Sequence, residues 1–230
     1  MTLQEAITQR HSVRAYRDTP LSDEAAEKLQ ETIGQCNAKG HLHIQLIQNE
    51  PKAFAGPLAR YGRFRNVTNY LVVAGSKSDD LDERAGYYGE QLVLLCQTLG
   101  LNTCWVGLSY RKIPDTYTLD EDEKIVCYIA VGYGQDQGKS HKIKNVNDVS
   151  NADDEGIPDW FRQGVQAALL APTAVNQQKF RFEYIPSADG SEAKVIARPG
   201  FSLVGYTRLD LGIAMLHFEI GSNRKITNFQ

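Results

Sequence analysis

Hydrophobic residues recur with the spacing of helices in some segments of this chain and with the pattern of strands in others, which predicts a mixed α+β protein. Apolar residues recur with helical spacing, several times after a capping side chain, in five segments. These segments span residues 2–9, 22–33, 85–99, 159–170 and 210–221. Alternating or continuous apolar runs predict strands at residues 41–47, 70–75, 103–107, 125–132, 180–185 and 193–197. Thr2, with Glu5 three residues later, and Ser22 are the expected caps of the first two helices.

A polar stretch separates two stretches of similar pattern. Residues 135–156 are rich in Gly, Lys, Asn and Asp, which predicts a connection on the surface. After it the order helix, strand, strand, helix begins again, and residues 210–221 resemble residues 89–100 in apolar spacing and in a closing glycine. We therefore expect two similar halves, residues 1–148 and 149–230. Chance similarity between α+β segments is the alternative.

Composition and charge exclude several classes of function. The chain is 42% hydrophobic and 23% charged, which is typical of a globular protein, and its net charge of −3 does not favour nucleic acid or anionic membranes as partners. No apolar leader follows Met1, and no run reaches the length of a membrane span. The cysteines form no Cys-x-x-Cys pair, so neither a zinc site nor a redox dithiol is indicated, and we expect a reducing cytoplasm. They are Cys36, Cys96, Cys104 and Cys127.

The first candidate for chemistry is the run Arg10-His11-Ser12-Val13-Arg14-Ala15-Tyr16. Two guanidinium groups and a hydroxyl can converge here on one oxyanion, because the planar fork of arginine donates two parallel hydrogen bonds to phosphate or carboxylate. The alternative is a solvated basic end of the first helix, where arginine complements the helix dipole.

The second candidate is the loop Ala171-Pro172-Thr173-Ala174-Val175-Asn176-Gln177-Gln178-Lys179-Phe180, which joins a helix to a strand. Thr, Asn and Gln carry donors and acceptors, so such a loop can recognise the polar edge of a heterocycle. An ordinary turn, in which Asn176 bonds to its own backbone, is the alternative. The equivalent segment of the first half, residues 34–40, lacks the Pro-Thr pair.

Four motifs resemble those of the FMN-dependent nitroreductase family. The run Arg10–Tyr16 is similar to its Arg-x-Ser-x-Arg-x-Phe/Tyr, and residues 171–178 are similar to its Ala-Pro-Ser/Thr-x-x-Asn-x-Gln. Residues 99–107 resemble its Leu-Gly-Leu-x-Thr-x-Trp-x-Gly, and Gly132-Tyr133 with the later Lys142 and Lys144 resembles its Gly-Tyr-Pro element and basic pair. The resemblance spans residues 3 to 223. Lys179-Phe180 stands where the family often has Pro-Trp, which bears on the wall of the substrate pocket.

The order of these motifs is unusual, because the proline loop comes last. The chain thus resembles a single-chain, internally duplicated branch of the family, in which the second half stands in for the partner subunit. The implied fold is a nitroreductase-like α+β fold, with antiparallel or mixed sheets flanked by helices and two halves that mimic the family dimer. The implied state is a monomer with one FMN.

The implied reaction passes a hydride from NAD(P)H through FMN to an electron-poor acceptor such as a nitroaromatic or a quinone. The flavin carries this chemistry and no side chain is catalytic, while the protein supplies position and electrostatics. The alternatives are a non-catalytic FMN-binding or regulatory protein of the same fold, and a specialised member such as a dehalogenase or a flavin-fragmenting enzyme. His41 and His43, with no third ligand placed near them, support a metal hydrolase poorly.

The resemblance implies cofactor-binding residues in both halves. Those of the first half are Arg10, His11, Ser12, Arg14, Arg63, Asn66, Trp105, Val106, Gly107 and Leu108. Those of the second half are Lys142, Lys144, Pro172, Thr173, Ala174 and Asn176. Arg10, Ser12 and Arg14 would bind the phosphate and the pyrimidine side of FMN, and Lys142 or Lys144 would add positive charge at the phosphate. Arg63 and Asn66 are candidates for the edge of the ring. The proline loop would cover the ring, and the amides of Gly107 and Leu108 would approach N5. Glu90 is either a neighbour of this site or a solvated helix residue, and we favour the latter.

Overall fold

The first two helices begin at side chains that cap them. The computed structural model describes residues 1–186, 193–227 and 229. At the start of α1 (Leu3–Gln9), the amide of Glu5 donates to Thr2 Oγ1 at 3.2 Å and the amide of Thr2 donates to Glu5 Oε2 at 2.8 Å. At the start of α2 (Asp23–Gly40), the amide of Ala25 donates to Ser22 Oγ at 3.3 Å. Both predicted caps are confirmed.

The chain divides into two compact units. The first holds residues 1–81 and 88–140, and the second holds residues 82–87 and 141–230. After α1 and α2, the elements up to the end of the first unit are β1 (Gln45–Ile47), the 3-10 turn η1 (Lys52–Phe54), α3 (Pro57–Tyr61), β2 (Asn69–Ser76), α4 (Leu81–Thr98), β3 (Asn102–Val106) and β4 (Glu123–Gly132). Those that follow are α5 (Val146–Val149), α6 (Asp159–Ala168), the 3-10 turn η2 (Ala174–Asn176), β5 (Phe180–Ile185), β6 (Lys194–Pro199) and α7 (Thr207–Ser222).

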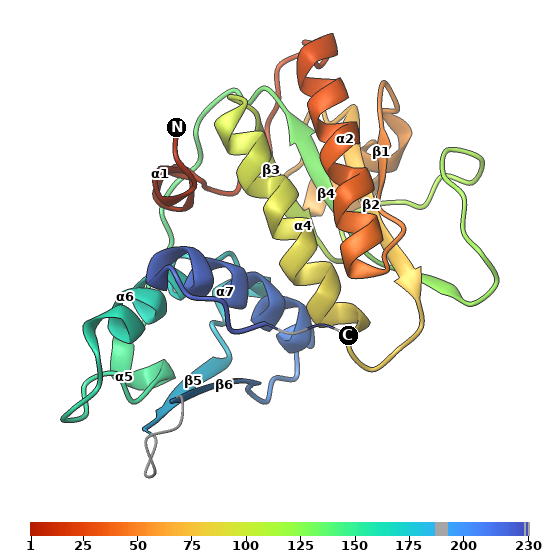
Figure 1. The fold of residues 1–230 in the computed structure, drawn as a ribbon. Helices are drawn as coiled ribbons and strands as arrows, with labels where there is room; N and C mark the ends of the chain where they lie inside the picture. The colour runs from red at the N-terminus through yellow and green to blue at the C-terminus, as the bar shows by residue number, and fades with distance from the viewer. Residues whose placement is uncertain (187–192, 228, 230) are drawn as a thin grey trace. The chain divides into compact units, whose positions relative to one another are not determined.

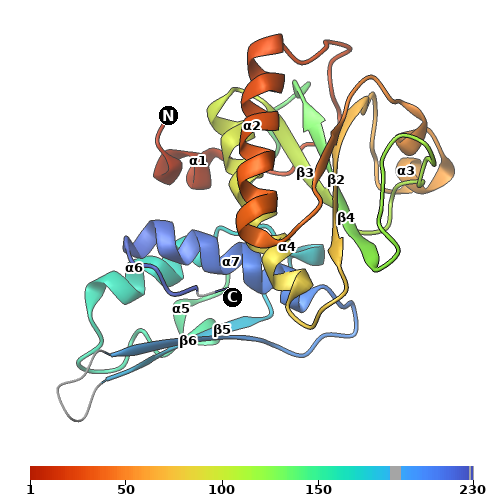
Figure 2. The same cartoon turned by 45° about the vertical axis from the view of Figure 1, so that its right-hand side comes forward.

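An antiparallel sheet of order β1-β2-β4-β3 forms the centre of the first unit. The two long inner strands are continuous apolar runs, as expected for strands that are covered on both faces. Helix α2 and the part of α4 from Tyr88 onward lie on one face of the sheet, whereas α3 lies on the other (Figures 1 and 2). Tyr70 pairs with Ala130 across the centre, and the register shifts between Val73 and Ala74.

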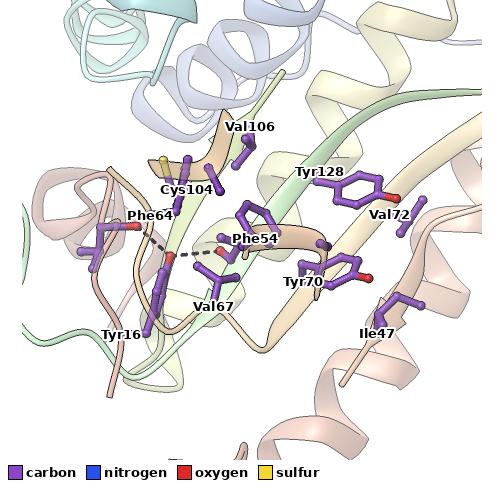
Figure 3. Packing of buried hydrophobic residues seen from close by; sticks show 14 residues of the cluster. Tyr16, Ile47, Phe54, Phe64, Val67, Tyr70, Val72, Cys104, Val106 and Tyr128 are labelled. Atoms are coloured by element: carbon purple, nitrogen blue, oxygen red, sulfur yellow. Dashed lines mark hydrogen bonds between the residues drawn. The ribbon is translucent and has the colours of Figure 1, made fainter. Parts of the chain in front are cut away.

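Aromatic rings fill the face of the sheet that α3 covers. Figure 3 shows Tyr70 and Tyr128 side by side on neighbouring strands, and their stacked rings have centroids 5.0 Å apart. Phe54 packs edge-on against Tyr70 at 5.7 Å. Tyr16 reaches the same cluster, and its hydroxyl donates to the carbonyl of Val13 at 2.7 Å. The run after α1 is therefore anchored to the core by its own tyrosine.

In the second unit, α6 and α7 approach closely because glycine lies at their contacts. A Cβ atom at Gly164 would lie 2.7 Å from the ring of Phe218, which stacks on Phe182 of β5 at 4.8 Å. The second turn of α4 meets α7 in the same way, since a Cβ at Gly86 would clash with the Leu209 carbonyl oxygen. Strands β5 and β6 form an antiparallel pair, which Figure 1 shows beside α5.

Several predicted elements have other bounds in the structure: α4 begins at Leu81 and α7 at Thr207, before the predicted starts at residues 85 and 210. Helix α2 runs on to Gly40, beyond the predicted end at Ile33, because Cys36 and Gly40 continue its buried stripe. The predicted strand 41–47 is shortened to β1: His41 takes a left-handed conformation that ends α2, and the side chain of Asn37 bonds both backbone groups of Ile44. His41 and His43 therefore lie outside the strand, and His43 Nδ1 lies 2.7 Å from Glu123 Oε2. The polar stretch 135–156 contains α5.

The α+β fold class is confirmed, with helices on antiparallel sheets. A helix, two antiparallel strands and a helix occur in each unit, as α2-β1-β2-α4 and as α6-β5-β6-α7. The internal duplication itself stays a prediction. In the described part of the chain, no helix is both long enough and apolar enough to cross a membrane.

Candidate functional site

The arginine run is held in place by backbone hydrogen bonds on both of its sides. The amide of Val13 donates to the Thr103 carbonyl of β3 at 3.0 Å, and Ser12 pairs with Thr103 in a parallel bridge. On the other side, the amide of Arg65 donates to the Arg14 carbonyl at 2.9 Å. The side chains of this run are thus presented from an extended segment that behaves as an additional short strand.

Arg10 ends α1 and is buried with only 3% of its side chain exposed. Its Nε lies 3.8 Å from Oε1 of Glu90 on α4, whose side chain is fully buried. The indole N–H of Trp105 donates to Oε2 of the same carboxylate at 2.8 Å. The preference for a solvated Glu90 was therefore wrong, because Glu90 lies at the centre of a buried link between α1, α4 and β3.

The Arg10 side chain retains an unused donor. Its Nε is buried and has no hydrogen-bond partner among the described residues. Burial lowers the pKa of the Arg10 guanidinium, and the carboxylate of Glu90 opposes this shift. A buried donor without an acceptor is unfavourable, so the geometry suits an anionic or carbonyl group of a ligand at this place.

Cys104 of β3 lies among the polar groups of the arginine run. Burial raises the pKa of its thiol, and the charge of Arg14, a hydrogen bond with Ser12 and the charge of Arg10 act in the opposite direction. Arg14 is exposed, while Ser12 and His11 are half-buried. The three members of the predicted Arg-x-Ser-x-Arg motif therefore all lie near one residue of β3.

The chain leaves β3 beside a turn that carries two more predicted residues. Val106 is buried, Trp105 and Gly107 are half-buried, and Leu108 is 76% exposed. A Cβ atom at Gly62 would lie 2.7 Å from Cβ of Ser109, so the turn at residues 62–66 packs directly against the segment that follows β3. In that turn Arg63 and Asn66 are exposed and left-handed, at φ 62° and 54°. The ten predicted residues of the first half are thus carried by three adjoining segments of the first unit.

In the second unit, Gln178 ties the predicted residues of the late loop together. Its side chain accepts from the amide of Lys144 at 2.9 Å, and it donates to the Lys142 carbonyl at 2.8 Å and to Asn176 Oδ1 at 2.9 Å. The amide of Gln178 donates to Thr173 Oγ1 at 3.1 Å. Lys144 Nζ donates to the carbonyls of Gln177 and Gln178. The ammonium of Lys144 therefore holds the late loop, and the role of Lys144 at a phosphate stays a prediction.

The late loop is strained and rests on a buried acid. Val175, Asn176 and Gln178 all have left-handed backbone, at φ 47°, 56° and 46°, which is unusual for a β-branched residue such as Val175. Such strain is found most often at functional sites. The carboxylate of Asp210 accepts from the amide of Ala174 at 2.9 Å and from Gln177 Nε2 at 2.6 Å. Burial raises the pKa of Asp210 to about 6, against the effect of these two hydrogen bonds.

Two kinds of residue were missed by reasoning from the sequence. Gln178 and Asp210 hold the late loop, and Glu90 and Cys104 meet the arginine run. Only Gln178 had a signal, as the second amide of a Gln-Gln pair within the loop motif. Among the described residues, no group of three His, Cys, Asp or Glu side chains is placed to hold a metal ion.

Comparisons with known proteins agree with this fold. No curated protein matches the chain. A nitroreductase from Thermotoga maritima MSB8, described as putative, shares 22% identity at a TM-score of 0.66, over 96% of this chain and 83% of its own. A nitroreductase from Desulfovibrio desulfuricans, also described as putative and solved with FMN, shares 21% identity at a TM-score of 0.51, over 69% of this chain and 99% of its own. A third such protein, from Exiguobacterium sibiricum 255-15 and also solved with FMN, shares 18% identity at a TM-score of 0.51, over 64% of this chain and 95% of its own.

The model of one protein family matches nearly the whole chain. It covers residues 2–222, which include the arginine run, β3 and the late loop. The predicted nitroreductase resemblance is thereby confirmed, and the chain belongs to the family described as "Putative TM nitroreductase".

Proposed function

We propose that this chain is an FMN-dependent oxidoreductase that passes a hydride from NAD(P)H through FMN to an electron-poor acceptor such as a nitroaromatic or a quinone. The observation that supports it best is the buried Arg10 Nε without an acceptor, on a run that β3 and the 62–66 turn hold in place. Family membership and the fold shared with two proteins solved with FMN support the choice of cofactor.

The residues present fit such a cofactor. Arg10, Ser12 and Arg14 would hold an anionic or carbonyl group, because charged donors form the strongest hydrogen bonds to such groups. The backbone that leaves β3 at Gly107 would lie against the ring, where the small side chain permits a close approach. Bound FMN would supply the hydride-accepting centre, and the protein would supply its position and its electrostatic surroundings.

The residues of the late loop are proposed to contribute to the same cofactor. Thr173 and Asn176 have polar side chains on a strained, well-anchored loop, and Lys142 is exposed next to them in the bonding network. We also propose a monomer with one FMN per chain. A reducing, cytoplasmic setting agrees with the four cysteines, which are buried and form no disulfide in the described part of the chain.

The visible spectrum of the purified protein and the identity of its flavin test the proposal. Cofactor released by heat should be FMN by chromatography, and light scattering with flavin counting should give one FMN per monomer. Release of FAD, or no flavin binding at any concentration, would refute the cofactor assignment. Flavin binding without steady-state oxidation of NADH or NADPH would instead support the alternative of a non-catalytic FMN-binding protein.

Arg10→Ala tests the site itself. Loss of a charge-assisted hydrogen bond, worth about 1.5–3 kcal/mol, should raise the Kd for FMN about ten- to a hundredfold. Arg17→Ala is the control, because Arg17 is exposed and directly follows the same run. Equal Kd values for both variants and the wild-type protein would leave Arg10 as a structural residue only.

A further inference from the structure

A cavity of about 710 Å³ lies in the second unit, and none of the residues assigned to FMN lines it. Its size is within the range of pockets that hold small molecules and cofactors. The lining comes from the start of α6, from β5 and β6, and from the segment after α7, and consists of Trp160, Tyr184, Ala193, Lys194, Val195, Ile196, Arg224, Lys225 and Ile226. One part of this lining is aromatic and apolar, and the other is basic.

The aromatic part is rigid. The Trp160 ring packs edge-on against Tyr184 at 5.8 Å and against Phe218 of α7 at 6.5 Å. The backbone of Tyr184 is held by Asn151, whose Oδ1 accepts from its amide at 2.9 Å and whose Nδ2 donates to its carbonyl at 3.0 Å. Trp160 and Tyr184 are both half-buried, so part of each ring is available to a planar ligand.

The basic part is also held in place by its backbone. Asn223 ends α7 in a left-handed conformation, and the amide of Arg224 then donates to Ser222 Oγ at 3.2 Å. Glu219 Oε1 accepts from the amides of Ile226 and Thr227, both at 2.7 Å. The segment that carries Arg224 and Lys225 is therefore tied back to the last turns of α7.

The charges of this cavity are not compensated within the described structure. Other arginines of the second unit pair with carboxylates: Arg181 and Arg198 with Glu183, and Arg208 with Glu83. For Lys194, Arg224 and Lys225, by contrast, no described carboxylate lies within 4.0 Å. The guanidinium carbon of Arg224 lies 4.7 Å from the centroid of the Trp160 ring, a cation–π contact that keeps the charge beside the aromatic wall.

We propose that this cavity binds an aromatic phosphate of the size of a mononucleotide. The ring would stack on Trp160 and Tyr184, since base–aromatic stacking contributes about 1–3 kcal/mol per base. The phosphate, with a charge of about −1.5 to −2 at neutral pH, would be bound by Lys194, Arg224 and Lys225. All of these residues belong to the second unit, so the inference is independent of the proposed flavin site.

Calorimetric titration of the full chain, loaded with one equivalent of FMN and freed of unbound flavin, with adenosine 5′-monophosphate tests the proposal. One nucleotide should bind per chain. Adenosine lacks the phosphate and ribose 5-phosphate lacks the ring, and each should bind about tenfold more weakly. Arg224→Gln should raise the Kd for the nucleotide about tenfold, and Lys225→Gln should raise it in the same direction. Arg198→Gln removes an equal charge from β6 outside the cavity and should leave the Kd within about twofold.

Three results would overturn the proposal. A Kd for the nucleotide that is unchanged in Arg224→Gln and Lys225→Gln would show that the basic residues do not bind its phosphate. Ribose 5-phosphate that binds as tightly as the nucleotide would reduce the cavity to an anion site without aromatic recognition. Nucleotide binding that Arg10→Ala abolishes and Arg224→Gln leaves intact would assign it to the first unit. Because FMN binding is measured separately on the same proteins, failure of the flavin proposal is distinguishable from each of these results.

Discussion

Glu90→Gln removes the charge from a fully buried ion pair while it leaves the shape of the side chain nearly unchanged. Glu90 lies 3.8 Å from Arg10 Nε and accepts from Trp105 Nε1 at 2.8 Å. Glutamine retains an oxygen that can accept the indole N–H, so the main effect is a buried Arg10 guanidinium without its counter-charge. Removal of one partner of a buried pair costs about 3–5 kcal/mol. The 3.8 Å separation, too long for a hydrogen bond from Arg10 Nε, favours the lower end, so we expect a loss of about 3 kcal/mol.

Glu90→Ala should cost more than Glu90→Gln. It also leaves the indole N–H of half-buried Trp105 without its acceptor, which adds about 1 kcal/mol. The matched control is Glu31→Gln. Glu31 Oε2 lies only 2.7 Å from Lys28 Nζ, but both side chains are about half exposed. An exposed pair contributes little, so this change should stay within about 0.5 kcal/mol despite its shorter distance.

Urea denaturation at pH 7, followed by far-UV circular dichroism, measures these differences through the midpoint and the slope. The expected order of destabilisation is Glu90→Ala, then Glu90→Gln, then Glu31→Gln. If Glu90→Gln and Glu31→Gln proved equally mild, burial would not decide the strength of these pairs, and the link between α1, α4 and β3 would have no energetic importance.

Three other changes test the second unit, and a fourth, Gly34→Ala on α2 of the first unit, serves as a control. The pKa of Asp210 is raised from 3.8 to about 6, so between these pH values the folded state keeps a proton that the unfolded state has released. The free energy of unfolding should therefore fall by roughly 3 kcal/mol as the pH rises through this range. Asp210→Asn should remove most of this fall in denaturation curves at pH 4 to 7, and the same pH dependence in the variant and the wild-type protein would contradict the reasoning. Gly164→Ala should destabilise by about 1–3 kcal/mol, because its Cβ would lie 2.7 Å from Phe218. On α2, a Cβ atom at Gly34 would have no neighbour within 4 Å, so Gly34→Ala should stabilise the protein by about 0.5–1 kcal/mol. Thermal melts in which Gly164→Ala and Gly34→Ala shift the Tm in the same direction would refute the packing argument. Asn176→Ala should lower both FMN affinity and the flavin-induced rise in Tm, whereas unchanged values would make the loop only a turn.

Local signals predicted the element types well. Thr2 and Ser22 cap their helices as expected, because an N-cap depends only on residues within one turn. The continuous apolar runs became the inner strands β2 and β4. The end of α2 was missed because the predicted apolar stripe ended at Ile33, whereas burial of Cys36 and the close approach of Gly40 to Tyr88 extend the helix. Contacts with residues far along the chain decided that boundary.

For the candidate site too, the sequence determined some features and left others to the folded structure. The sequence by itself determined which residues carry the chemistry, since Arg10, Ser12 and Arg14 form a short contiguous motif that is recognisable without a fold. It also determined that the late loop is rich in polar side chains. It did not show that Glu90 is buried, because helical spacing describes a face of α4 and says nothing of what covers that face.

Only the tertiary structure decided which groups meet across long separations in the sequence. Trp105 and Arg10 share the carboxylate of Glu90, and Asp210 bonds a loop more than thirty residues before it. Trp160 meets Arg224, and their contact forms part of a basic, aromatic cavity. Periodicity and caps depend on neighbours along the chain, whereas burial, pKa shifts and ligand cavities depend on neighbours in space, so they follow only once the chain is folded.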